Sequence, residues 1–156
     1  MSRRDQIRMS DDELRAYVAE QRVINVATMS PNGRPHLAPL WYFPAGGGRL
    51  STWTYRKSQK VANLMRLAQA TVLIESGESY EQLRGVSMEC DVEFVEETDT
   101  VADIGTRLAM RYAGLEGDPP AELTAGIAHQ APKRIGLVFT PTKTVSWDHT
   151  KLGGTY

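Results

Sequence analysis

The chain has 156 residues, the length of one domain (1–156) with a single sizeable core. Its 18 basic and 19 acidic residues give a formal net charge of −1, which favours neither nucleic acid nor an anionic membrane surface as a partner. The lone Cys90 permits no internal disulfide, and no apolar run of about 18 residues is present. With no signal-peptide pattern either, we expect a cytoplasmic protein without a membrane partner.

The first predicted element is a helix over residues 10–21. Ser10 and Glu13 form a capping box at its start. Leu14, Tyr17 and Val18 then share one face at helical spacing, which predicts that this helix covers an apolar surface.

Short strands separated by turn residues make up most of the remaining chain. The predicted strands are 23–28, 34–43, 49–55, 70–75, 83–95, 134–139 and 144–147. Ser30 to Gly33 is a turn in which Pro31 presets φ, and Pro141 separates the last two predicted strands. Apolar and polar residues alternate over 83–95, as in a sheet with one solvated face.

Two further helices and a loop complete the pattern. The helices are predicted over 58–67 and 98–112, with one or two helical turns within 121–129 and a C-terminal tail over 148–156. Close, mostly hairpin-linked strands with few helices predict a mainly β fold, a small antiparallel barrel with helices packed around it.

The segment from Leu50 to Leu64 joins a predicted strand to a predicted helix. A helix N-terminus offers unpaired amide N–H groups and the positive end of the helix dipole. Arg56, Lys57 and Lys60 add three cations there, and Ser58 adds a hydroxyl. We therefore predict an anion site, with phosphate as the usual anion. Local sequence leaves open a solvated basic turn in which Ser58 is an ordinary N-cap.

The strands beside this turn carry residues suited to a planar ligand. Thr52, Trp53 and Thr54 place two hydroxyls and a large ring directly before the cations. In the strand over 34–43, Pro39 cannot donate to a ladder, so this strand is either a plain edge strand or lies beside a ligand. Tryptophans such as Trp41, Trp53 and Trp147 are most often aromatic residues of the core or of a subunit interface.

Other catalytic patterns are absent from the sequence. The three histidines and Cys90 do not have the spacing of a metal site. No Gly-x-Ser-x-Gly motif occurs, and Gly46 to Gly48 lack the Lys-Ser/Thr of a phosphate-binding P-loop. We predict no metal and no catalytic side chain.

The order of motifs resembles that of a known family. It runs from the capped helix through Val-Ile-Asn-Val-Ala-Thr (23–28), Pro-Asn-Gly-Arg-Pro-His (31–36) and Pro-Leu-Trp-Tyr-Phe (39–43) to Ser-Thr-Trp-Thr (51–54) and Lys-Ser-Gln-Lys-x-x-Asn (57–63). Together these resemble the pyridoxamine 5′-phosphate oxidase-like split β-barrel proteins, and within them the actinobacterial flavin/deazaflavin oxidoreductases that use coenzyme F420.

The resemblance implies a six-stranded split barrel that forms a homodimer, with the cofactor at the interface and the chemistry on the cofactor. Lys60 corresponds to the phosphate-binding lysine and Ser58 to a hydroxyl donor to the same group. The implied cofactor-binding residues are Pro39, Leu40, Trp41, Thr52, Trp53, Thr54, Lys57, Ser58, Gln59 and Lys60. The additional C-terminal substrate-binding segment of true pyridoxamine phosphate oxidases has no counterpart here, so vitamin B6 oxidation is not expected.

Three functions follow as expectations. The first is an F420-dependent reductase that transfers a hydride from the reduced deazaflavin to a small conjugated organic molecule. The second is a non-catalytic module that holds F420, FMN or a tetrapyrrole. The third is an FMN-binding oxidase. Several donors near one helix start suit the anionic tail of F420 better than the compact phosphate of FMN. The physiological substrate is not encoded in a recognisable motif.

Overall fold

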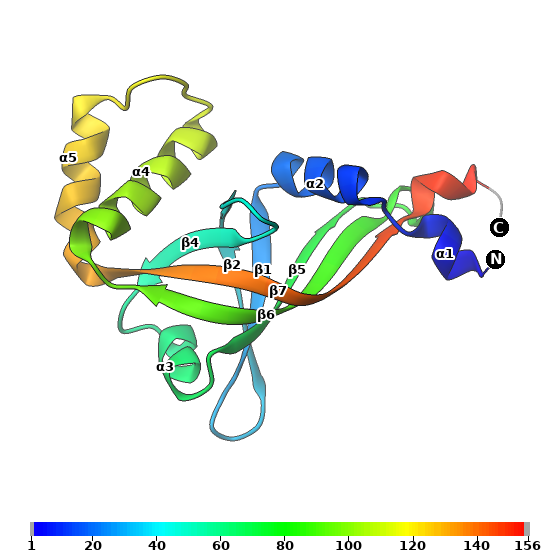
Figure 1. Ribbon diagram of the computed structural model, residues 1–156, viewed down its shortest axis with the longest axis horizontal. Coiled ribbons are helices and arrows are strands. Elements are labelled where there is room, and N and C mark those ends of the chain that lie inside the picture. The colour runs from blue at the N-terminus through cyan, green and yellow to red at the C-terminus, as the bar shows by residue number, and fades with distance from the viewer. Residues whose placement is uncertain (1, 155–156) are drawn as a thin grey trace.

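The structure is a computed structural model that describes residues 2–154 (Figure 1). The helices are α1 (Arg3–Ile7), α2 (Asp11–Glu20), α3 (Gln59–Arg66), α4 (Thr98–Ala113) and α5 (Ala121–Gln130). Three short 3₁₀ helices are η1 (Tyr80–Gln82), η2 (Ala131–Lys133) and η3 (His149–Leu152). The strands are β1 (Val23–Met29), β2 (Pro35–Trp41), β3 (Phe43–Pro44), β4 (Leu50–Tyr55), β5 (Gln69–Ser76), β6 (Arg84–Val95) and β7 (Arg134–Asp148).

All strands belong to one antiparallel sheet in the order β2-β1-β5-β6-β7-β4-β3, and this sheet curls into a half-barrel. The mainly β architecture with surrounding helices is therefore confirmed, but the sheet has seven strands where six were expected. The predicted strand over 34–43 is interrupted at Tyr42, whose fully buried side chain points into the core. The chain leaves β2 there and pairs with β4 at the other end of the sheet.

The prediction that Pro141 separates two strands is wrong. Strand β7 continues from Arg134 to Asp148, and Pro141 lies opposite Cys90 of β6. The register shifts at this point, because Glu89 pairs with Lys143 while Cys90 pairs with Pro141, so Thr142 is the extra residue. A bulge of this kind accommodates a proline, which has no N–H for the ladder, without ending the strand.

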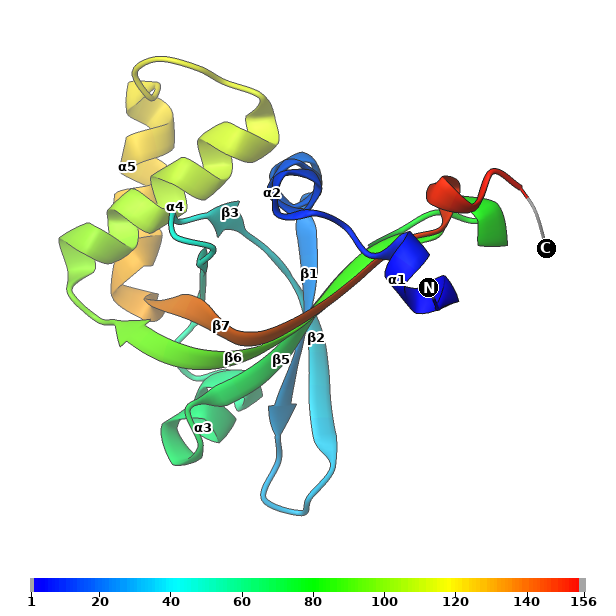
Figure 2. The same ribbon diagram turned by 45° about the vertical axis from the view of Figure 1, so that its right-hand side comes forward.

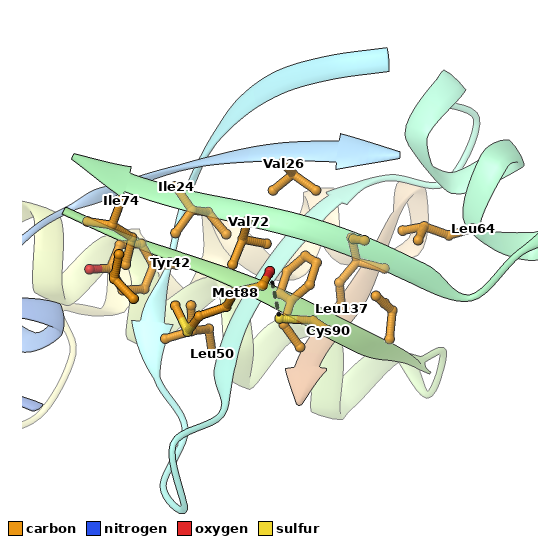
Figure 3. Packing of buried hydrophobic residues seen from close by; sticks show 14 of the residues in the cluster. Ile24, Val26, Tyr42, Leu50, Leu64, Val72, Ile74, Met88, Cys90 and Leu137 are labelled. Atoms are coloured by element: carbon orange, nitrogen blue, oxygen red, sulfur yellow. Dashed lines mark hydrogen bonds between the residues drawn. The ribbon is translucent and has the colours of Figure 1, made fainter. Parts of the chain in front are cut away.

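The core lies inside the curled sheet. Buried side chains from β1, β5, β6 and β7 meet those of β4 and α3, and they point toward one another in Figure 3. The members labelled there are Ile24, Val26, Tyr42, Leu50, Leu64, Val72, Ile74, Met88, Cys90 and Leu137. Residues of β1 alternate between this core and the outer face, so Ile24 and Val26 are buried while Val23 is 42% exposed. Strand β1 thus has one apolar inner face.

Helices close the ends of the half-barrel. In both views α4 and α5 pack side by side at one end of the sheet, α2 lies across one mouth and α3 lies at the opposite mouth (Figure 2). Helix α2 begins at the predicted capping box, with Ser10 Oγ accepting from the Glu13 amide. Helix α4 approaches β4 closely at Gly105, where an added Cβ would lie 2.5 Å from the Trp53 ring. No other residue type fits that contact without a shift.

The two ends of the described chain lie together at the far end of the sheet from α4 and α5. The short α1, which was not predicted, has its own capping box formed by Ser2 and Asp5. In the predicted tail, Lys151 Nζ donates to the Arg8 carbonyl at 2.8 Å and to Glu13 Oε2 at 2.6 Å. Between residues 2 and 154, no helix has both the length and the apolar character needed to cross a membrane.

Candidate cofactor-binding site

The start of α3 presents a hydroxyl and an amine that the protein itself leaves largely unsatisfied. Ser58 is the N-cap residue, but its side chain makes no capping hydrogen bond, and its Oγ is buried with no partner in residues 2–154. Lys60 Nζ donates to Thr54 Oγ1 at 3.1 Å. A buried polar atom without a partner is costly. The predicted anion site therefore contains a hydroxyl without a partner and an amine with a single hydrogen bond.

A third group at this site, Arg134, was missed in the sequence. Its guanidinium carbon lies 3.7 Å from the ring centroid of Tyr55 and 4.9 Å from that of Trp53. Its Nε is buried without a partner in the described chain, while Nη2 donates to Gln130. No local pattern marks Arg134, because only the pairing of β4 with β7, which sets Tyr55 opposite Arg134, brings it here.

The positive charges of this cluster are not balanced by nearby carboxylates. Burial, and then the positive charge of Arg134, lower the pKa of Lys60. The ion pairs found within residues 2–154 include none that involves Lys57, Lys60 or Arg134. Two neighbouring cations without a carboxylate favour the binding of an anion, which would offset their mutual repulsion.

The other residues of the turn are arranged differently. Arg56, counted among the cations of the turn, instead donates to the Glu96 carbonyl at 2.7 Å and pairs with the Glu96 carboxylate at 3.6 Å. Lys57 is exposed. Gln59 Nε2 donates to Asn63 Oδ1 at 2.9 Å. The anion site is therefore formed by fewer cations of the turn than its sequence indicates.

Asn63 fastens α3 to the end of β1. Its side chain is 1% exposed, and its Nδ2 donates to Thr28 Oγ1 at 3.1 Å and to Ser30 Oγ at 3.3 Å. Together with Gln59, these bonds fix the first turn of α3 against the barrel. This explains the asparagine at the end of the Lys-Ser-Gln-Lys-x-x-Asn pattern in structural terms.

Away from the turn at Ser58, strand β4 approaches the end of β2. Thr52 Oγ1 donates to the Trp41 carbonyl at 2.5 Å, and Thr52 and Thr54 are both buried on the inner side of β4. From the Trp41 carbonyl, a row of polar groups thus follows the inner side of β4 to Lys60. These residues were predicted to share a site; Thr52 and Thr54 lie on β4, between Trp41 at the end of β2 and Lys60 in α3.

The remaining predicted residues face other directions. The Trp41 side chain is 54% exposed and stacks on Tyr112 of α4, with ring centroids 3.7 Å apart and planes 10° from parallel. Pro39 is exposed on β2, an edge strand whose single partner within residues 2–154 is β1, while Leu40 packs against the core. Trp53 lies on the other face of β4, against α4. Trp53 therefore has the packing role that was the alternative for the tryptophans.

Comparison with known protein families shows which family the chain belongs to. The sequence profile of the pyridoxamine 5′-phosphate oxidase family matches residues 10–148. The chain belongs to the pyridoxamine 5′-phosphate oxidase family. Among curated proteins none matches the chain in sequence.

Within residues 2–154, no group of three or more metal-binding side chains is assembled, so no residues are assigned to a metal.

Solved structures of this family's fold are similar to the chain over most of its length. A conserved hypothetical protein from Mycobacterium tuberculosis is 36% identical, with a TM-score of 0.87, over 100% of this chain and 95% of that one. A structure named F420 reductase is 22% identical (TM-score 0.63), over 83% of this chain and 93% of that one. The haem storage protein HutZ from Vibrio cholerae is 14% identical (TM-score 0.66), over 87% of this chain and 94% of that one. The last two likenesses concern the fold alone.

Proposed function

We propose that the protein is an F420-dependent oxidoreductase, which transfers a hydride from the reduced deazaflavin to a small conjugated organic molecule. One observation carries the proposal: the unpartnered Ser58 Oγ lies in the same turn as Lys60, whose amine and the neighbouring Arg134 have no carboxylate partner in the described chain. A phosphate with its negative oxygens supplies the acceptors that these donors lack.

The residues fit a phosphorylated planar cofactor in the following way. Lys60, Ser58 and Lys57 would hold the phosphate, and the row of polar groups along β4 from Thr54 to Thr52 would run beneath the linker toward the end of β2. Pro39, Leu40 and Trp41 would border the ring. The bound deazaflavin supplies the hydride, and the protein supplies binding, orientation and exclusion of water. We assign no side chain as a proton donor.

The preference for F420 over FMN rests on charge. The F420 tail carries a phosphodiester and several carboxylates, so it can use an exposed cation such as Lys57 in addition to the half-buried Lys60. The fold is shared with an F420 reductase and also with a haem storage protein, so the choice of F420 rests on the charges alone. FMN remains the alternative, because its single phosphate also suits Ser58 and Lys60. A carrier of F420, FMN or a tetrapyrrole without turnover would use the same groups.

We further propose that the cofactor is bound by a homodimer. The outer face of β1 and β2 exposes several large apolar side chains, among them Leu37 at 67%, Val23 at 42% and Met29 at 40%. Several exposed apolar side chains on one sheet face are typical of an interface. The turn at Ser58 is half-buried in the single chain, and a second subunit would supply the missing wall.

Fluorescence titration of the cofactor-free protein tests the function, with F420 and FMN compared side by side at two ionic strengths. We expect tighter binding of F420 at both and a loss of affinity at the higher salt concentration, since charge drives the contact. Tighter binding of FMN at both ionic strengths would replace F420 by FMN. Binding of neither below about 0.1 mM, or roughly −5.5 kcal/mol, would refute the cofactor assignment.

A further inference from the structure

We propose that the groove between β3 and α4 binds a small organic carboxylate with an apolar body, and that Arg107 recognises the carboxylate. The groove has a volume of about 440 Å³, which is within the usual range for small-molecule sites. Its walls come from Phe43 and Pro44 on one side and from Met110, Leu115 and the loop after α4 on the other. In Figure 2, β3 lies beside α4. The inference concerns binding alone and does not rest on the proposed redox function.

Arg107 supplies the charge for this groove. Its guanidinium carbon lies 4.1 Å from the ring centroid of Phe43, and the residue is exposed. Asp103 lies one helical turn earlier, yet no ion pair of Arg107 is found within residues 2–154. A guanidinium stacked on a ring keeps its in-plane N–H donors free and is held in one orientation, which suits bidentate binding of a carboxylate.

The neighbouring arginine has a different role. Arg111 donates to the carbonyl oxygens of Tyr42, Ala19 and Gln21 at 2.5, 2.8 and 2.6 Å. These three bonds occupy its guanidinium and fix the wall of the groove. Arg107 is therefore the arginine of the groove that is available to a ligand, and the surrounding apolar side chains explain why the rest of that ligand should be apolar.

The groove lies near the end of β2 that would border the cofactor ring. Phe43 follows Trp41 by two residues, whereas Lys60 lies beyond the other end of β4. A ligand in the groove would thus be well separated from the phosphate turn. The polyanionic tail of F420 is a poor match for these apolar walls, whereas an aromatic or aliphatic monocarboxylate matches them.

Methyl NMR of the cofactor-free protein, labelled at methionine and titrated with 4-phenylbutyrate, tests the inference. The Met110 signal, assigned with Met110→Leu, should shift saturably with a Kd below about 5 mM. Met65, which is exposed on α3, serves as the reference within the same molecule. The neutral 4-phenylbutan-1-ol should bind at least about threefold more weakly, because the charge contact is partly exposed.

Two variants separate recognition from incidental contact. Arg107→Gln should weaken binding of the acid at least about threefold and leave binding of the alcohol unchanged, whereas Arg15→Gln on α2 should change neither. Leu115→Asp, at an exposed position, should weaken the acid more than the alcohol. The proposal is overturned if Met110 does not shift saturably, if acid and alcohol bind equally well, or if Arg107→Gln binds the acid as the unmodified protein does.

Discussion

Lys60 Nζ donates to Thr54 Oγ1 at 3.1 Å, although the two residues belong to different elements. Thr54 is 4% exposed at the end of β4, and Lys60 lies in the first turn of α3. The bond draws the amine over the strand, where burial and Arg134 disfavour its charge and lower its pKa. The hydrogen bond to Thr54 thus holds the Lys60 amine at the proposed anion site, although burial and repulsion from Arg134 disfavour its positive charge.

Lys60→Met should weaken binding of the preferred cofactor at least about tenfold, since a charge-assisted contact contributes roughly 1.5–3 kcal/mol. The stability of the cofactor-free protein should change little, because the loss of the bond to Thr54 is offset by removal of a half-buried charge. Affinity should also fall with rising pH, beginning below the ordinary Lys pKa, since only protonated Lys60 attracts an anion. Titration of both proteins measures this. Lys143→Met, on β7, is the control. If Lys60→Met bound the cofactor as tightly as the unmodified protein, the turn would be an ordinary surface turn and not a binding site.

Ser58→Ala separates a ligand role from a helix-capping role. Ser58 makes no side-chain capping bond, so its replacement should change the free energy of unfolding by only a few tenths of a kcal/mol, while cofactor affinity falls. Ser10→Ala is the matched variant, because Ser10 Oγ does accept from Glu13, and there a loss of about 1 kcal/mol is expected. Urea unfolding of both variants provides the comparison. A loss of equal size at Ser58 would identify it as a structural cap.

The part of the site that could be predicted is the part that is contiguous in sequence. The turn from Lys57 to Lys60 follows a strand directly, so its residues lie together whatever the rest of the fold does. Arg134 is more than 70 positions away and arrives only through the pairing of β4 with β7. The stacking of Trp41 on Tyr112 likewise depends on where α4 packs. Long-range register is not readable from local periodicity.

The fold, like the site, could be predicted only where its features depend on residues close together in the sequence. Alternation and turn residues located the strands, because side chains on a half-buried sheet obey a period of two. Pro141 was misjudged, since a bulge at Thr142 is a property of two paired strands and not of one segment. The break at Tyr42 also depends on the far end of the sheet, where β3 finds its partner β4.

Glycine-to-alanine substitutions in two helices should have opposite effects. At Gly105 in α4 the new Cβ would lie 2.5 Å from the Trp53 ring, so Gly105→Ala should destabilise the protein by about 1–3 kcal/mol. At Gly126 in α5 nothing lies within 4 Å, so Gly126→Ala should stabilise it by about 0.5–1 kcal/mol through helix propensity. Thermal unfolding followed by tryptophan fluorescence checks both. Stabilisation by Gly105→Ala would contradict the close packing of α4 on β4.

Cys90 should make the protein sensitive to alkali. Burial raises the pKa of its thiol from 9.0 to about 12, so the folded state retains a proton that the unfolded chain loses. Stability from this source is complete below pH 9 and is lost as the pH rises from 9 to 12, by at most about 4 kcal/mol. Urea unfolding at pH 8, 9 and 10 should show a shallower decline in Cys90→Ala than in the unmodified protein. Parallel declines would contradict the buried thiol.

Leu37→Asp should abolish the proposed dimer. Leu37 is 67% exposed on the outer face of β2, opposite Ala27 of β1 and on the same face as Met29 and Val23, so the substitution places a charge in this face without disturbing the core. Burying an unpaired carboxylate at an interface is strongly unfavourable. Sedimentation equilibrium at micromolar concentration should give a 34.6 kDa species (twice 17.3 kDa) for the unmodified protein and 17.3 kDa for the variant. Leu115→Asp, at an exposed position in the loop after α4 and outside β1 and β2, should remain dimeric. A 17.3 kDa species for the unmodified protein would refute the dimer, and a dimeric Leu37→Asp would place the interface elsewhere.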